Sequence, residues 1–134
     1  MKNDLVFEYI PTESEEQQAV VAWAEMVSGF VPDLEMLVHI PNGGYRMKQT
    51  AVRLKKEGVK PGFPDLNLPV PNDKYHGLYI EMKKRDHSNK PSKNQIWWIN
   101  RLRKKGYKVA VSYGADEAIG EICKYLGIEK EIEL

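Results

Sequence analysis

An apolar segment that carries two charges constrains the fold of this chain most. Residues 77–84 read GLYIEMKK, a run that predicts a buried strand. Because alternate side chains of a strand share a face, Glu81 and Lys83 point the same way, opposite to Leu78, Ile80 and Met82. The pair is therefore either a surface salt bridge on the wet face of a hairpin or part of a chemical site.

The preceding segment, residues 63–70 with the sequence FPDLNLPV, predicts a second strand that joins the first through PNDK. A hairpin that turns at Asp73 places residues equally far before and after it opposite each other, and this pairs Asp65 with Glu81 at a Cβ separation of about 5 Å. Pro69 and Pro71 each remove a hydrogen-bond donor, so a bulge could shift this register.

Two opposed carboxylates repel each other unless a positive charge lies between them. Magnesium-class cations prefer carboxylate and carbonyl oxygens, which Asp65, Glu81 and the main-chain carbonyl of Met82 can provide. Such a cation, Mg²⁺ or Mn²⁺, lowers the pKa of a bound water, and Lys83 can orient that water or hold a phosphate oxygen. The constellation suits hydrolysis of a phosphodiester and needs no organic cofactor.

Charge is distributed unevenly along the 134 residues, although the net charge is only +1. Residues 1–35 hold one basic and eight acidic residues, whereas residues 74–108 hold eleven basic and two acidic ones. A concentrated basic segment indicates contact with a polyanion or a solvated lysine-rich face, and it exceeds what a small-molecule phosphohydrolase needs.

Length and composition predict one domain over residues 1–134, with 42% hydrophobic residues to build its core. The single cysteine and the lack of a secretory signal favour a cytoplasmic protein. No apolar run is long enough to cross a membrane.

Periodicity and punctuation predict an α/β fold of order αβαββαβα, a mixed central sheet flanked by helices. Thr12 or Ser14 caps the first helix, and Ser92 with Gln95 forms a capping box for the third. The expected helices cover residues 15–29, 48–58, 92–106 and 116–127, and the expected strands cover residues 35–40, 63–70, 77–84 and 107–113.

These segments resemble the PD-(D/E)XK nuclease superfamily and, within it, the VRR-NUC family of small stand-alone phage and bacterial nucleases. The resemblance rests on GVKPGFPDL (58–66), GLYIEMKK, the glutamine-bearing helix after it, and HIPNGGYR (39–46). It implies a PD-(D/E)XK nuclease-like fold and a metal-dependent endonuclease. It also implies a homodimer that acts on branched DNA such as Holliday junctions.

The resemblance assigns metal-binding roles to Asp65 and Glu81 and catalytic roles to Lys83 and Gln95. Glu13, which the family's Glu-x-x-x-Gln spacing selects, is the carboxylate that the resemblance implies for the first helix, and Glu16 is the alternative.

The same resemblance implies nucleic-acid contacts by Asn42, Arg46, Lys84, Lys93 and Gln95. His39 is more typical of a structural histidine. Of Trp97 and Trp98, helical spacing predicts that one lies in the core and the other at an interface.

Overall fold

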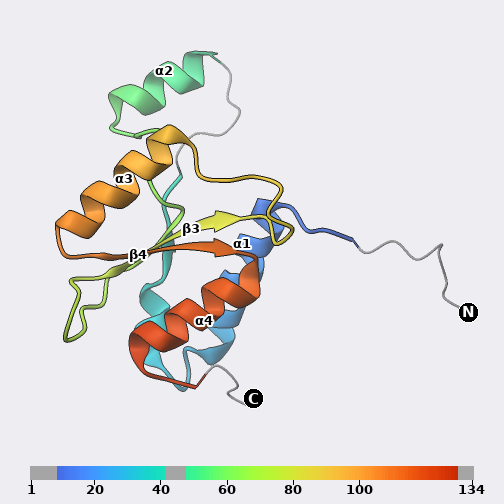
Figure 1. Cartoon of the computed structure of the whole chain (residues 1–134), viewed down its shortest axis with the longest axis vertical. Coiled ribbons are helices and arrows are strands. Elements are labelled where there is room, and N and C mark those ends of the chain that lie inside the picture. Colours follow the sequence, from blue (N-terminus) through green and yellow to red (C-terminus); the bar gives the residue numbers. More distant parts are fainter. Residues whose placement is uncertain (1–8, 42–47, 130–134) are drawn as a thin grey trace, which may run out of the picture.

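A four-stranded mixed sheet organises the chain, and the computed structural model describes residues 9–41 and 48–129 (Figure 1). The elements are α1 (Glu13–Val27), the 3₁₀ helix η1 (Pro32–Met36), β1 (Val38–His39), α2 (Lys48–Lys56), β2 (Leu66–Leu68), β3 (Leu78–Lys83), α3 (Lys93–Lys104), β4 (Lys108–Tyr113) and α4 (Ala115–Leu126). The predicted order αβαββαβα is confirmed, with η1 added before β1.

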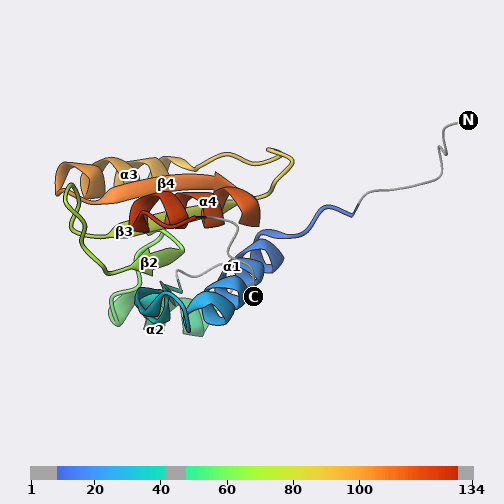
Figure 2. The same cartoon turned by 90° about the horizontal axis from the view of Figure 1, so that it is seen from below.

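The strands lie in the order β1-β2-β3-β4, with β3 and β4 parallel and the other pairs antiparallel. Figure 2 shows β2, β3 and β4 side by side. Since α3 connects the parallel strands β3 and β4, its first turn lies near the carboxyl end of β3. This crossover brings the Gln95 end of α3 to the charged end of β3.

Helices cover the sheet in two layers, which Figure 1 shows above and below β3 and β4. One core lies between α1, α4 and the sheet, and it includes Val20, Leu66, Ile80 and Ile122. A second, smaller core under α3 contains Ile99. Helix α2 has no buried residue.

Two capping boxes fix the helices that start near the charged end of β3. Thr12 Oγ1 accepts a hydrogen bond from Glu15 N at 3.1 Å, and Glu15 Oε1 accepts one from Thr12 N at 2.9 Å. Ser92 and Gln95 make the same reciprocal pair at the start of α3, as predicted.

The predicted strand over residues 35–40 is wrong in its first half. Pro32 starts a 3₁₀ turn that runs through Met36, so of the predicted strand only Val38 and His39 form β1. Proline at the first helical positions favours such a turn because its φ is already helical. Strand β2 is also shorter than residues 63–70, in keeping with prolines at positions 64 and 69 that cannot donate to a ladder.

Within the part of the chain that the structure describes, no helix is both long enough and apolar enough to span a membrane.

Candidate active site

The predicted register of the β2–β3 hairpin is confirmed. Leu66 pairs with Ile80 and Leu68 with Leu78, so the hairpin is symmetric about Asp73. Strand pairing stops at Leu66, one residue after Asp65, but Asp65 still reaches β3, because its Oδ2 accepts a hydrogen bond from Met82 N at 2.8 Å.

The edge strand holds the main chain of Asp65. Its carbonyl oxygen accepts hydrogen bonds from Ile40 N and from His39 Nδ1, each at 2.8 Å. With the main chain bound to β1, the side chain is left to face β3.

Glu81 and Lys83 are buried, with exposed fractions of 1% and 5%, and this rules out the alternative of a salt bridge on a wet face. Lys83 Nζ lies 3.5 Å from Glu81 Oε2, and Gln95 Nε2 donates to the same oxygen at 2.7 Å. The other oxygen, Glu81 Oε1, is buried without a hydrogen-bond partner among the described residues. A buried carboxylate oxygen without a donor is costly, so this atom suggests an absent ligand.

Electrostatics in this site disfavour two bare carboxylates. Burial, and then the charge of Asp65, raise the pKa of Glu81 to about 8, although Lys83 opposes the shift. Burial also raises the pKa of Asp65, against the hydrogen bond from Met82 N. The pair therefore holds a proton near neutral pH unless a cation takes the place of that proton.

The donor set fits a hard divalent cation. Asp65 and Glu81 offer two neighbouring carboxylates, one with an unpartnered oxygen. The N–H and C=O of one strand residue point to the same side, so the Met82 carbonyl lies on the Asp65 side of β3 with the Met82 N–H. In residues 9–41 and 48–129 no three His, Cys, Asp or Glu side chains could hold a metal ion together, so main-chain and water oxygens would have to complete the shell.

Of the two candidate glutamates in α1, the structure brings Glu13 to this site. Glu13 Oε2 lies 3.8 Å from Lys83 Nζ and accepts a hydrogen bond from Asn89 Nδ2. Glu13 also lines an open cavity of about 310 Å³ together with Ser14, Gln17, His39, Asp65 and Met82.

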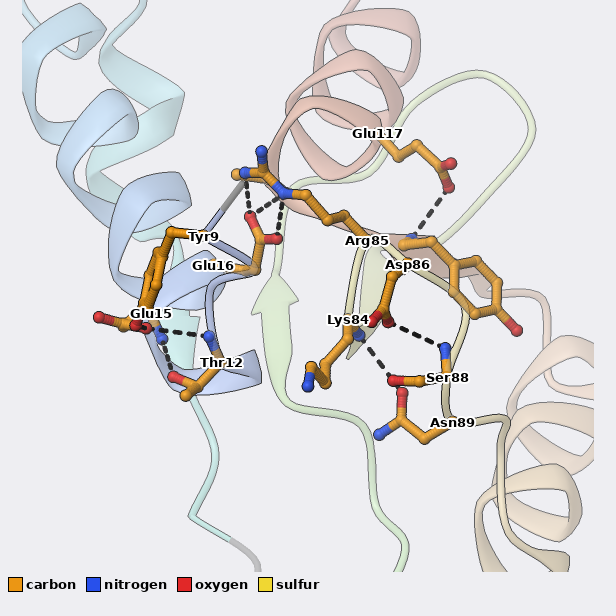
Figure 3. A network of polar contacts seen from close by, with 12 residues as sticks. Tyr9, Thr12, Glu15, Glu16, Lys84, Arg85, Asp86, Ser88, Asn89 and Glu117 are labelled. Carbon is orange, nitrogen blue, oxygen red and sulfur yellow. Dashed lines mark hydrogen bonds and ion pairs between the residues drawn. The ribbon is translucent and has the colours of Figure 1, made fainter. Parts of the chain in front are cut away.

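Glu16 is buried but binds the half-exposed Arg85 instead, as Figure 3 shows. Its oxygens accept hydrogen bonds from Arg85 Nε at 2.7 Å, Arg85 Nη2 at 2.9 Å and Ala115 N at 3.0 Å. These bonds lower the pKa of Glu16, with the Arg85 bond the largest cause. Glu16 thus joins α1 to the loop after β3 and to the start of α4.

Gln95 combines both functions suggested by the sequence. Its Oε1 accepts from Ser92 N at 2.8 Å in the capping box, while its Nε2 donates to Glu81. The cap therefore fixes the orientation of the amide that contacts the carboxylate.

The predicted nucleic-acid contacts are only partly placed. Asn42 and Arg46 lie outside the described residues. Lys93 is exposed at the start of α3, and Lys84 is half-buried just after β3. His39 is exposed at the mouth of the cavity with Asp65, in addition to its structural hydrogen bond.

One part of the prediction for the two tryptophans, that one of them lies in the core, is confirmed. Trp98 packs in the core under α3, with its ring 4.9 Å from that of Phe63, whereas Trp97 is 51% exposed. The interface role of Trp97 stays a prediction.

Sequence reasoning missed Asn89 and Arg85, which hold Glu13 and Glu16. Both lie in the loop between β3 and α3, at sequence separations of 76 and 69 residues from their partners. No local pattern encodes contacts over such separations. The sole hint is that the loop after β3 offers polar side chains near the starts of α1 and α4, which both carry acidic residues in their first turns.

Comparison with known proteins agrees with this geometry. The family model of the VRR-NUC domain matches residues 6–116. A solved structure described as a VRR-NUC domain protein is 29% identical and has a TM-score of 0.72, covering 90% of this chain and 93% of its own. No curated protein matches the chain.

Proposed function

Because this chain belongs to the VRR-NUC family, whose domain has a nuclease-type fold, we propose that it is a metal-dependent endonuclease that hydrolyses DNA phosphodiesters. Branched DNA such as a Holliday junction is the proposed preferred substrate, and the cytoplasm of a bacterial or phage-infected cell is the proposed location. The observation that carries the proposal is the buried, unpartnered Glu81 Oε1, in a carboxylate that Asp65 and Lys83 both adjoin.

Asp65, Glu81 and the Met82 carbonyl would hold Mg²⁺ or Mn²⁺. The bound cation would lower the pKa of a water molecule and offset the charge that develops on the phosphate. Lys83 would orient the attacking water and hold a phosphate oxygen, since its ammonium group is fixed between Glu81 and Glu13. Gln95 would keep Glu81 in a productive orientation through its 2.7 Å hydrogen bond.

Backbone contacts would come from Lys84, Lys93 and Gln95, and from Asn42 and Arg46 outside the described residues. Contacts of this kind position a nucleic acid but carry no base sequence, so recognition would depend on DNA shape and weaken steeply with salt. A homodimer would offer two such sites to the two strands that resolution of a junction must cut.

The test is cleavage of a labelled four-way junction, beside linear duplex, flap and single-stranded substrates, with Mg²⁺, Mn²⁺ or EDTA. Paired nicks in the junction are expected for wild type with metal, and none for Lys83→Ala. Lys124→Ala, which removes an exposed lysine of α4, is the matched control and should cut normally. Salt-sensitive binding without cleavage in either metal would instead indicate a non-catalytic or partner-dependent binding module.

A further inference from the structure

Two aromatic rings stack at the carboxyl end of the sheet, beside the candidate active site. The rings of His87 and Tyr113 lie 3.9 Å apart between centroids and only 9° from parallel. Tyr113 is the register partner of Lys83 in the parallel β3–β4 pair, so the two side chains share a face of the sheet. The stack is therefore one strand away from the lysine proposed to act on the phosphate.

The backbone holds His87 in an unusual conformation. Its φ is 61°, and among the described residues no other non-glycine has a positive φ. This region is sparsely populated for residues with a side chain and persists where the surroundings enforce it. The position of the ring is thus a fixed feature of the loop between β3 and α3.

Contacts on both sides of His87 enforce that conformation, and Figure 3 shows most of them. Asp86 accepts a hydrogen bond from Ser88 N at 2.9 Å, and Arg85 is bound to the buried Glu16. The loop also packs against the start of α4, since a Cβ on Gly114 would lie 2.9 Å from Arg85 Cβ. A loop anchored in this way presents its exposed ring with little entropy left to lose on binding.

We propose that His87 and Tyr113 form a stacking platform for an unpaired nucleobase of the nucleotide next to the phosphate that is cut. The proposal rests on the proposed nuclease function, because the DNA strand must pass Lys83. His87 is exposed in the described structure, so the flat two-ring stack is accessible to solvent, in a basic loop that includes Lys84 and Lys90. Nucleobases stack on His and Tyr rings irrespective of base identity, which fits recognition by shape.

A platform of this kind selects unpaired nucleotides. A base inside a duplex is already stacked on its neighbours and pays an unstacking cost before it can bind a protein ring. Bases at a branch point or in a single strand pay less. The platform would thereby favour branched over fully paired DNA.

The test uses oligonucleotides with 2-aminopurine at an unpaired position next to the cut site, in EDTA so that binding is measured without cleavage. Stacking on a protein ring should quench the fluorescence for wild type. His87→Asn removes the imidazole ring, and asparagine tolerates the positive φ at this position. The double variant His87→Asn/Tyr113→Thr removes both rings, and threonine suits the strand position of Tyr113. Phe30→Ala, which deletes a 65% exposed ring after α1, is the control.

Quenching is expected for wild type and Phe30→Ala and is lost in the double variant, with affinity for the unpaired substrate falling roughly tenfold. Affinity for a fully paired duplex of equal length should not change. A wild type that binds and cuts DNA but leaves 2-aminopurine unquenched, or a double variant that still quenches it, overturns the platform alone. If wild type binds none of these DNAs, the proposed nuclease function fails and the platform fails with it.

Discussion

Glu16 and Glu81 are both 1% exposed, yet they occupy opposite electrostatic environments. Glu16 accepts two hydrogen bonds from Arg85 and one from Ala115 N, and the pKa of Glu16 is lowered. Glu81 has one oxygen bound by Gln95 and Lys83 and one without a donor, and its pKa is raised to about 8.

The difference shows that burial of a carboxylate does not by itself mark a functional site. A buried carboxylate whose oxygens all accept hydrogen bonds contributes to the structure. A buried carboxylate with an oxygen that lacks a donor instead lowers the stability of the fold. Arg85 of the loop over residues 84–92 binds Glu16, and Gln95, just after the same loop, binds Glu81, so each glutamate is a matched control for the other.

The rate of DNA cleavage should distinguish Glu81 from Glu16 most clearly. Glu81→Gln should lower the rate on order of 10²- to 10⁴-fold, because it removes a carboxylate proposed to bind the metal. Glu16→Gln should stay within about tenfold of wild type, since Glu16 contacts no proposed reacting group. Single-turnover cleavage of a junction at saturating enzyme measures both, and a folded Glu16→Gln protein as inactive as Glu81→Gln would break the comparison.

The pH dependence of stability should differ in sign. In EDTA, Glu81 keeps its proton in the folded state up to about pH 8 but loses it near its ordinary pKa when unfolded. Folding therefore takes up a proton between these values, and the free energy of unfolding falls as pH rises through that window, by at most about 1.4 kcal/mol per pH unit. The pKa of Glu16 is lowered, so its contribution is present above the unfolded pKa and is lost as acid titrates the folded carboxylate.

Urea unfolding between pH 3 and 9 tests this prediction. Glu81→Gln should flatten the fall between the ordinary carboxyl pKa and about pH 8 and leave the acid limb, and Glu16→Gln should do the reverse. Adding Mg²⁺ to wild type at pH 8 should raise the stability, because a bound cation offsets the repulsion between Asp65 and Glu81, whereas Glu81→Gln should respond less. A wild-type stability in EDTA that does not fall between the ordinary carboxyl pKa and about pH 8 contradicts the raised pKa.

Stability at a fixed pH of 8 should change in opposite directions. Glu16→Gln should cost about 2 kcal/mol, because it weakens charged hydrogen bonds to a buried acceptor, although the half-exposed Arg85 regains water. Glu81→Gln in EDTA should be neutral or stabilising, since it relieves repulsion and needs no cation. Equal losses in the two variants, measured by chemical denaturation, would remove the distinction.

The sequence predicted what local rules control. The hairpin register followed from the two-residue period and the turn at Asp73, because a one-residue slip would expose Leu66 and Ile80. The capping box of α3 followed from the short motif at Ser92, and for α1 the sequence offered Thr12 and Ser14 as caps, of which the structure uses Thr12. The family resemblance placed Asp65, Glu81, Lys83 and Gln95, which the fold brings to one site.

Contacts between distant segments were beyond such rules. Glu13 and Glu16 are less than one helical turn apart, so the family's spacing favoured Glu13 but left Glu16 as an alternative, and the packing of α1 against the loop after β3 distinguishes them. The burial of Lys83 likewise depends on α1 and on the loop that carries Asn89, which no alternation pattern describes. The 3₁₀ turn before β1 begins at Pro32, whereas the prediction for this segment relied on strand propensity.

The smallest expected effect concerns Gln95, which makes both a structural contact in the capping box and a contact with the proposed metal-binding Glu81. Gln95→Ala removes its half of the capping box and the hydrogen bond to Glu81, whereas Ser92→Ala removes cap contacts alone. Each should cost roughly 1 kcal/mol of stability, but only Gln95→Ala should slow cleavage, by a few-fold to tenfold, as Glu81 loses its orienting donor. If both variants slow cleavage equally at matched stability, the cap rather than the amide positions Glu81, and the division between structural and functional contacts at this helix start disappears.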